Sequence, residues 1–433
     1  MDQVFLDSIH KAHFVGIGGI GVSALARLML ANGVSVTGSD RTPSLITEKL
    51  EAEGAKVFFE HEQKNLPDAL DLVVYSPAIA DDNPELCTAR ERGVLTHSYP
   101  GALGKISRGM RTIAISGTHG KTTTTAMIAG VLVDTKRSPT VIVGSLLKGS
   151  GSNFVGGTSD LFVVEACEYK RSFLHLSPEI LVITNIDNDH LDYYGTIEGV
   201  QKAFAEFVAK VPRSGAIVCD PSDPLVKPVL QGVVTRIVDY TKEFLTSPLL
   251  VPGEHNKKNA QVALAVARLL DVSEKDAMRS LAMFEGTWRR MEYKGEMMGV
   301  PIYDDYAHHP TEVRATLQGF RAQYPASCIR VVFQPHLYSR TKLLLYDFAK
   351  SFSDADEVIV APIYVAREKP DPAISGEILM KAISEHHNNV RFCGDLPAIK
   401  MYLRETMQKG DIMVTMGAGD VYKIGEELVS DSL

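Results

Sequence analysis

The sequence has few cysteines and no long hydrophobic run. The five cysteines, among 433 residues, are odd in number and scattered, and none forms a C-x-x-C pair. Neither a disulfide framework nor a zinc site is therefore expected. No stretch of about 18 consecutive apolar residues occurs, and the first residues, MDQVFLDSIHK, are acidic where a signal peptide would be basic. We expect a cytoplasmic protein with no membrane association.

An excess of positive charge is also missing. Lys and Arg number 45 against 53 for Asp and Glu, which gives a formal net charge of -8. A nucleic-acid binder that neutralises many phosphates is therefore not expected. The hydrophobic fraction of 45% over this length is enough for two or three domains that each bury a core.

Strand-like apolar runs alternate with helical patterns along the whole chain, which predicts an α/β fold with mostly parallel sheets. Three blocks of this kind are expected, and we place their boundaries at 1–107, 108–293 and 294–433. A helix pattern from Lys258 to Leu270 ends the second block, and the third opens near VPIYDDYAHHP.

The first block contains a complete dinucleotide-type fingerprint. Gly16, Gly18 and Gly21 have G-x-G-x-x-G spacing after the strand pattern HFVGIG, and Asp40 follows nineteen residues after the last glycine. The pattern fits nicotinamide or flavin binding, another phosphate-bearing ligand, or a tight turn without a ligand. A nicotinamide-dependent dehydrogenase is one function that this block alone would favour.

The second block opens with IAISGTHGKTTTTAM, Ile113 to Met127. The strict G-x-x-x-x-G-K-[ST] motif fails because Ile115 stands where its first Gly belongs. Lys121 could still reach terminal phosphates, and Thr122 could offer its hydroxyl to magnesium. The alternative is a capped helix without a ligand. A lysine in the first turn of a helix opposes the helix dipole unless an anion balances it, which favours a phosphate.

Polar residues at two strand ends are candidate metal ligands. Glu165 ends the apolar run LFVVE, and His190 follows the run LVITNIDNDH. Ligands of open α/β sheets bind at the edge formed by the carboxyl ends of the strands, and magnesium prefers oxygen ligands. Glu165 is therefore the natural ligand. His190, by itself, is better interpreted as a turn histidine with a local hydrogen bond.

Eight segments, in this order, resemble the Mur ligases of bacterial peptidoglycan synthesis over essentially the whole chain: GIGGIGVSALA (16–26), SGTHGKTTTT (116–125), EACEYKRSFL (165–174), TNIDNDHLDYY (184–194), GEHNKKNAQVALA (253–265), GTWRRME (286–292), DDYAHHPTEV (304–313) and QPHLYSRT (334–341).

The resemblance implies a Rossmann-like UDP-sugar domain, a central P-loop ATPase-like domain, and a Rossmann-like C-terminal domain that closes on ATP and binds the amino acid. The shortened loop G-T-x-G-K-T is the form this family uses, so the resemblance implies that the nucleotide is ATP, bound with Mg²⁺. The motifs are most similar to those of the members that join L-alanine to the lactyl carboxylate of UDP-N-acetylmuramate through an acyl phosphate.

The resemblance also implies roles for individual residues. The ATP-binding residues would be Gly117, Thr118, His119, Gly120, Lys121, Thr122, Thr123, Asn256, Asn259, Arg290 and Asp305. The UDP-sugar would be bound by Gly18, Gly19, Ile20, Gly21, Ser39, Asp40, His61 and Ser76. The amino acid would be bound by Tyr306, His336 and Arg340, and the metal by Thr122, Glu165 and His190. Catalysis would rest on Lys121, Glu165, His190 and His308.

The sequence leaves a second interpretation open for several of these residues. Arg289 could replace Arg290, Asn256 could be only an N-cap, His61 could lie in a solvated loop, and Arg340 could be an exposed surface residue. Among whole-protein alternatives, a ligase that recycles murein tripeptide shares all eight segments. A regulatory ATP-binding protein without ligase activity would bind the same ligands. The expected assembly is a monomer or a homodimer.

One position departs from sister ligases. Those that add later residues carry a carbamylated lysine fourteen or fifteen positions after the residue matching His190. Phe204 and Ala205 stand there in this chain. Lys202 is nearby, but two positions along a helix turn a side chain to the other face. A site that needs no carbamate is therefore expected.

Overall fold

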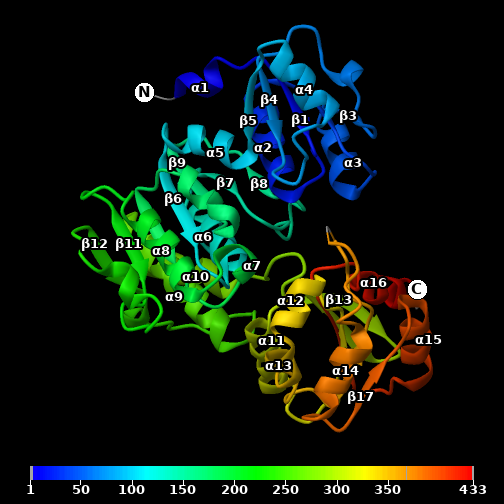
Figure 1. Ribbon diagram of the computed structural model, residues 1–433. Helices are drawn as coiled ribbons and strands as arrows, with labels where there is room; N and C mark the ends of the chain where they lie inside the picture. The colour runs from blue at the N-terminus through cyan, green and yellow to red at the C-terminus, as the bar shows by residue number, and fades with distance from the viewer. Residues whose placement is uncertain (1–2, 367, 432–433) are drawn as a thin grey trace. The chain divides into compact units, whose positions relative to one another are not determined.

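The computed structural model describes residues 3–366 and 368–431 and contains three β-sheets in chain order (Figure 1). The chain divides into two compact units, residues 1–248 with 259–283, and residues 249–258 with 284–433. The first unit holds two of the sheets and the second unit holds the third. The expected α/β architecture of three domains is confirmed.

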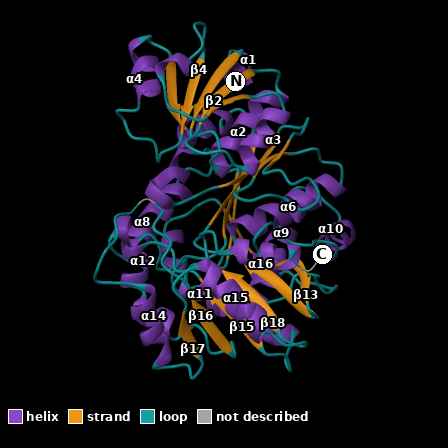
Figure 2. Ribbon diagram, turned by 90° about the vertical axis from the view of Figure 1, so that its right-hand side faces the viewer, coloured by secondary structure: helices purple, strands orange, loops and turns teal. Residues whose placement is uncertain are grey.

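The first sheet is parallel, with strand order β3-β2-β1-β4-β5. Its strands are β1 (Lys11–Val15), β2 (Ser35–Ser39), β3 (Lys56–Phe58), β4 (Leu72–Tyr75) and β5 (Leu95–Ser98). Its helices are α1 (Gln3–Asp7), α2 (Ile20–Ala31), α3 (Leu45–Ala52), the 3-10 turn η1 (Gln63–Asn65), α4 (Pro84–Glu91) and α5 (Tyr99–Ser107). Figure 2 shows α4 on one face of this sheet and α2 with α3 on the other, so both faces are covered.

The second sheet has the order β12-β11-β10-β6-β9-β7-β8 and is parallel except for the β7–β8 pair. Its strands are β6 (Arg111–Ser116), β7 (Thr140–Ile142), β8 (Phe154–Val155), β9 (Leu161–Glu165), β10 (Ile180–Ile183), β11 (Ala216–Cys219) and β12 (Arg236–Asp239). Its helices are α6 (Lys121–Asp134), η2 (Tyr169–His175), α7 (Leu191–Tyr194), α8 (Ile197–Val208), η3 (Lys227–Leu230), η4 (Tyr240–Lys242), α9 (Glu254–Leu269) and α10 (Glu274–Ala282).

The third sheet has the order β13-β14-β18-β15-β16-β17, in which only the β13–β14 pair is antiparallel. Its strands are β13 (Glu292–Met297), β14 (Val300–Asp305), β15 (Ile329–Phe333), β16 (Glu357–Val360), β17 (Val390–Phe392) and β18 (Ile412–Met416). Its helices are α11 (Pro310–Gln323), α12 (Tyr338–Leu343), α13 (Leu345–Ala349), α14 (Gly376–Ser384), α15 (Leu396–Thr406) and α16 (Tyr422–Ser430).

Two local expectations need correction. Helix α9 begins at Glu254, four residues before the predicted start at Lys258, because its first turn is polar and carries no apolar periodicity. The third sheet begins with β13 at Glu292, ahead of the VPIYDD strand at which we expected it to open. Strand β13 is an antiparallel edge strand with a polar sequence, EYKGEM, which lacks the continuous apolar run of a buried strand.

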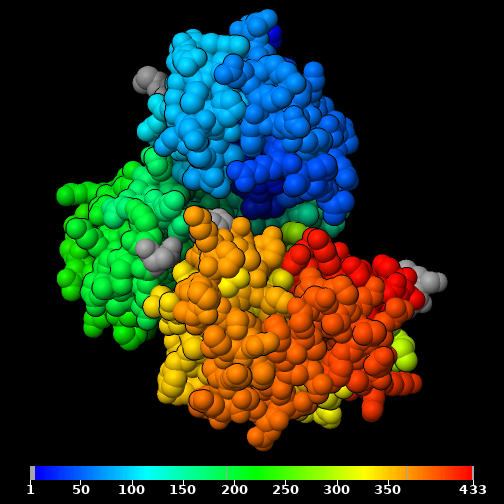
Figure 3. Space-filling model, turned by 45° about the vertical axis from the view of Figure 1, so that its right-hand side comes forward, coloured from blue at the N-terminus to red at the C-terminus, as the bar shows by residue number. Residues whose placement is uncertain are grey.

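The first and second sheets are joined by a polar clasp between α2 and the segment that leads into β8. Asn153, fully buried, donates to Ser23 Oγ (2.8 Å) and to the carbonyl of Ile20. Arg27, also buried, donates to Asn153 Oδ1 (2.5 Å) and pairs with Glu53 (2.8 Å). One hydrophobic core runs through both sheets of this unit. In the space-filling view the blue and the green surfaces of these two domains adjoin (Figure 3).

Candidate active site

The phosphate-type loop lies between β6 and α6, as the sequence predicts. Gly117 and Gly120 have positive φ angles of 127° and 81°. A Cβ at Gly117 would lie 2.0 Å from Thr184 Oγ1, and one at Gly120 would lie 2.5 Å from Asn259 Oδ1. Both positions therefore require glycine on conformational and steric grounds. The loop opens onto the N-terminus of α6, which is a favourable place for an anion.

Lys121, the first residue of α6, is held by three groups. Its ammonium donates to the carbonyls of Gly117 (2.5 Å) and Thr118 (3.0 Å) and lies 2.9 Å from Glu168 Oε2. Burial opposes the charge, but the Glu168 carboxylate and neighbouring negative groups raise the pKa of Lys121 above its ordinary value. The lysine is therefore charged and fixed in place. Glu168 was not among the predicted residues.

Thr122 and Glu165 are brought together at the adjoining edge of the sheet. The Thr122 hydroxyl donates to Glu165 Oε1 (3.1 Å), and the backbone N–H of Gly144 donates to Glu165 Oε2 (2.8 Å). A hydroxyl beside a carboxylate at a helix N-terminus is an oxygen donor set of the kind that Mg²⁺ prefers. These two residues thus fit a magnesium ion held next to bound phosphates.

His190, the third predicted metal ligand, faces a different carboxylate. Its Nε2 lies 3.8 Å from Glu168 Oε1, its ring packs on Tyr169, and its φ of 54° is in the left-handed region. The structure therefore groups His190 with Lys121 around Glu168, whereas Thr122 and Glu165 form the neighbouring pair. A buried carboxylate shared by a lysine and a histidine can orient both side chains.

The segment after β10 shapes the phosphate loop. Asn185 Oδ1 accepts from the N–H of His119 (2.9 Å), and the His119 ring lies 3.0 Å from Asp187 Oδ2. Thr118 Oγ1 accepts from the N–H of Asp187 (2.8 Å). The side chains of Thr118 and His119 therefore contact this segment, and the backbone N–H groups of both residues also donate to Asn185. Asn185 and Asp187 were missed as individual residues, although they lie inside the motif TNIDNDH.

The two asparagines of α9 are both buried. Asn259 Oδ1 accepts from the Thr124 hydroxyl (3.2 Å), beside Gly120. Asn256 lies in the first turn of α9, where its Nδ2 donates to the carbonyl of Pro252 (2.7 Å). Asn256 is therefore not an N-cap, which removes the structural alternative that the sequence left open for it.

In the first domain the glycine turn leads into α2. Gly16 has a φ of 80°, and the N–H of Gly18 donates to Asp40 Oδ2 (2.8 Å) at the end of β2. Gly19 is the N-cap of α2, so the N–H groups of the first turn are available to a ligand. Ser76, at the end of β4, lies beside Gly16.

Ser39 and His61 meet at a carboxylate that the sequence analysis missed. Ser39 donates to Glu85 Oε2 (2.5 Å), and His61 Nδ1 lies 3.3 Å from the same atom. Burial would raise the pKa of Glu85, but the nearby His13 ring and hydrogen bonds from Ser39 and Asn65 hold it below its usual value. The Ser39 side chain is fully buried and committed to Glu85, so this arrangement favours a supporting role for its hydroxyl over direct ligand contact.

In the third domain Asp305 ends β14 and is 3% exposed. Its carboxylate accepts from the N–H groups of Met291 and Ala307, each at 2.8 Å. Burial raises the pKa of Asp305 to about 6, although Arg290 opposes the shift.

The neighbouring residues Arg289 and Arg290 differ in burial and in their partners. Arg289 is buried, pairs with Asp304 (2.8 Å), and donates to the carbonyls of Gly417 (2.5 Å) and Gly419 (2.8 Å). Arg290 is more exposed, with 27% of its side chain accessible against 4% for Arg289. Of the two, Arg290 is the better placed for a ligand.

The remaining predicted residues form one cluster beside β14 and β15. His308 Nδ1 lies 2.9 Å from the carbonyl of Tyr306, and the rings of His308 and His336 are 5.9 Å apart. Arg340 Nη1 is 3.3 Å from His336 Nδ1, and His336 stacks on Tyr364. Tyr364, which was not predicted, forms one wall of the cluster.

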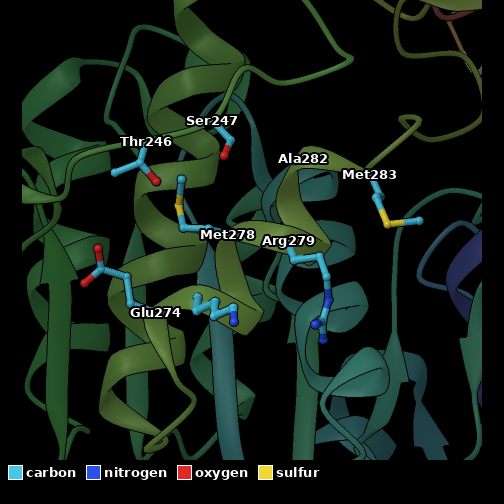
Figure 4. Close-up of a pocket in the computed structure, with 8 residues that line it drawn as sticks. Thr246, Ser247, Glu274, Met278, Arg279, Ala282 and Met283 are labelled. Carbon is cyan, nitrogen blue, oxygen red and sulfur yellow. The ribbon is translucent and has the colours of Figure 1, made fainter.

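A separate surface depression of about 680 Å³ lies between α10 and residues 246–247 (Figure 4). It is lined by Thr246, Ser247, Glu274, Lys275, Met278, Arg279, Ala282 and Met283. None of these residues belongs to the predicted sites, so this depression is distinct from the residues described above.

Three family models match successive parts of the chain. They are described as the Mur ligase family, catalytic domain (residues 11–111), the Mur ligase middle domain (115–243), and the Mur ligase, glutamate ligase domain (289–419). The chain belongs to the Mur ligase family. The family membership expected from the sequence motifs is confirmed.

Individual Mur ligases are similar over nearly their whole length. The UDP-N-acetylmuramate–L-alanine ligase of Desulfosudis oleivorans is 42% identical and covers 99% of both chains. The ligase of the same name from Clostridium botulinum is 40% identical over 98% of both. Among solved structures, the UDP-N-acetylmuramate–alanine ligase of Thermotoga maritima has a TM-score of 0.82 at 30% identity, covering 97% of this chain and 98% of that one.

A murein peptide ligase from Psychrobacter arcticus is also similar, with a TM-score of 0.73 at 25% identity over 97% of this chain and 98% of that one. The similarity to the alanine ligase structure is higher by both measures. Among the described helices, none combines the length and the apolarity needed to span a membrane.

Proposed function

We propose that this protein is an ATP-dependent ligase that joins L-alanine to the lactyl carboxylate of UDP-N-acetylmuramate in peptidoglycan precursor synthesis. The observation that carries the proposal is the 42% identity, over 99% of both chains, to a relative of that name. The reaction would transfer the γ-phosphate of ATP to the carboxylate. The amine of alanine would then attack the acyl phosphate and release phosphate.

The residues of the second domain suit the phosphoryl transfer step. Two anions, a carboxylate and a phosphate, must approach each other, and fixed positive charge lowers that barrier. Lys121, held charged by Glu168, would contact the transferring phosphate. Magnesium, held by Thr122 and Glu165, would neutralise phosphate charge. His190 stays the third proposed metal ligand, and its position 3.8 Å from Glu168 would let that carboxylate orient its ring.

The first domain would bind the UDP-sugar. Of the predicted residues Gly18, Gly19, Ile20 and Gly21, the last two offer backbone N–H groups to the diphosphate at the start of α2. The N–H groups of Gly18 and Gly19 already donate to Asp40 Oδ2 (2.8 Å) and to the Gly16 carbonyl (3.2 Å) and would shape the turn. Asp40 holds this turn through Gly18. Ser76 and His61 would line the nucleoside part. Ser39 would support His61 both directly, at 2.8 Å from its Nδ1, and through Glu85.

The third domain would contribute the amino-acid pocket and further ATP contacts. Arg340, oriented by His336, would pair the carboxylate of alanine through two hydrogen bonds. Tyr306 and His308 would face the reacting groups. Asp305 would accept a hydrogen bond from the ATP ribose, Arg290 would contact phosphate, and Asn256 and Asn259 would offer their amides to adenine. The predicted domain boundaries, 107/108 and 293/294, stay predictions, as do a cytoplasmic location and a monomeric or dimeric state.

The deciding experiment measures phosphate release from ATP with UDP-N-acetylmuramate, in parallel with L-alanine and with the murein tripeptide. Release that requires L-alanine supports the proposal. Release only with the tripeptide would identify a recycling ligase instead. Nucleotide binding without release would indicate a regulatory protein. Reduction of a nicotinamide cofactor without ATP hydrolysis would indicate a dehydrogenase.

A further inference from the structure

Tyr99, the first residue of α5, lies against the first turn of α2. The Ser98 hydroxyl caps α5 by accepting from the N–H of Gly101 (3.3 Å), which fixes the backbone from which the Tyr99 side chain departs. A Cβ added at Gly21 would lie 2.7 Å from Tyr99 Cζ and 2.9 Å from its hydroxyl oxygen. Figure 1 shows α5 next to α2 in the same domain. The phenol therefore touches the helix terminus at which the diphosphate would bind.

The Tyr99 hydroxyl is available to a ligand. Its side chain is partly exposed, and no hydrogen-bond partner of the hydroxyl is found among residues 3–366 and 368–431. The first intrahelical bond of α2 runs from Ser23 N to Gly19 O, so the N–H groups of the three residues between them have no acceptor in the helix. A phenolic donor and free backbone donors thus converge on one place.

The surroundings keep this phenol protonated. Burial, followed by the negative charge of Glu165, raises the pKa of Tyr99 above its ordinary value. A neutral phenol is a hydrogen-bond donor, and its bonds to charged phosphate oxygens are stronger than those between neutral groups.

We propose that the Tyr99 hydroxyl donates a hydrogen bond to the diphosphate of the UDP-sugar. The inference rests on the UDP-sugar site proposed above and adds a side-chain donor from α5 to the backbone donors of α2. It also gives a physical reason for glycine at position 21, because any side chain there would displace the phenol. The donor would hold the diphosphate and so position the sugar for reaction.

The test is Tyr99→Phe, which removes the hydroxyl and keeps the ring packed on Gly21. Affinities for UDP and for UDP-N-acetylmuramate are measured by calorimetry. We expect both to weaken by about tenfold to a hundredfold, the loss typical of one hydrogen bond to a charged group. The KM for the UDP-sugar should rise in parallel, while the KM values for ATP and alanine and the melting temperature stay unchanged. The control, Tyr346→Phe, removes an exposed hydroxyl on α13 and should change neither affinity.

Two results would overturn the inference. Unchanged affinity for UDP in Tyr99→Phe would show that the hydroxyl makes no contact with the diphosphate. A loss confined to UDP-N-acetylmuramate would place the contact on the sugar or its carboxylate instead. Failure of the underlying function looks different, since wild-type protein would then bind neither UDP nor UDP-N-acetylmuramate.

Discussion

Replacing Glu168 with glutamine should destabilise the protein without nucleotide and make ATP a stronger stabiliser. The Lys121–Glu168 pair is buried, with 14% and 3% of the two side chains exposed. Glutamine keeps the shape of the side chain but leaves the lysine charge without its counter-charge. Breaking one partner of a buried ion pair costs about 3 kcal/mol or somewhat more. For a unit of this size the thermal midpoint would fall by roughly 6 °C or more.

The second half of this prediction concerns ATP. A bound phosphate brings negative charge to Lys121, which replaces part of what Glu168→Gln removes. We therefore expect ATP with magnesium, in the absence of the UDP-sugar, to raise the thermal midpoint of the variant more than that of the wild type. The measurement is a thermal unfolding series with and without nucleotide.

Glu206→Gln is the matched control for this experiment. It makes the same change in the exposed Arg171–Glu206 pair, where the cost should be below about 1 kcal/mol and independent of ATP. If ATP raised the thermal midpoints of Glu168→Gln and wild type by the same amount, the reasoning would be refuted. Bound phosphate would then not replace Glu168 as the counter-charge of Lys121.

Four further outcomes can be measured. Lys121→Ala should lower turnover by at least about 100-fold in the phosphate-release assay; near-normal turnover would contradict the loop assignment. Arg340→Lys should raise the KM for alanine by roughly tenfold while that for ATP stays unchanged, and equal shifts in both would argue against the carboxylate contact. Lys202→Ala should keep most activity, also in bicarbonate-free buffer; an inactive variant revived by a short carboxylic acid would indicate a carbamate. Burial, with Arg290, lowers the pKa of His255 to about 4, so the unfolded state takes up a proton that the folded state does not, and stability should fall between about pH 6.5 and 4. In denaturant unfolding, the free energy of unfolding of His255→Gln should fall less over that pH range than that of the wild type. The same pH dependence in both proteins would show that His255 is not the cause.

The order of elements and the glycine-dependent loops were predictable from the sequence because they follow local rules. Gly117 and Gly120 stand between a strand and a helix with positive φ angles, and Pro310 starts α11 after an extended His309. The same holds for Phe204, which is fully buried while Lys202 is exposed on α8. Helical periodicity alone predicts that difference.

The partners that support the site were not predictable in the same way. Glu168, Glu85 and Tyr99 each meet residues from other elements, at sequence separations of 47, 46 and 78 positions from Lys121, Ser39 and Gly21. No local pattern marks such a contact. The one available signal was a charged residue at or shortly after the end of a strand, and we used it for Glu165, the last residue of β9, but not for Glu168, three residues later. Strand β13 was missed because an edge strand need not be apolar.

The buried clasp between Asn153 and α2 bears on how this chain can be divided or recombined. The Asn153 side chain has its hydrogen-bond partners in the other domain, and Arg27 is buried against it. A fragment ending at residue 107 would uncover Arg27 and the apolar residues of the shared core, while the complementary fragment would uncover Asn153. Leaving such groups without partners is unfavourable in either fragment. Exchange of the sugar-binding domain between relatives would therefore need to carry residues 143–155 along with it, even though they belong to the neighbouring sheet.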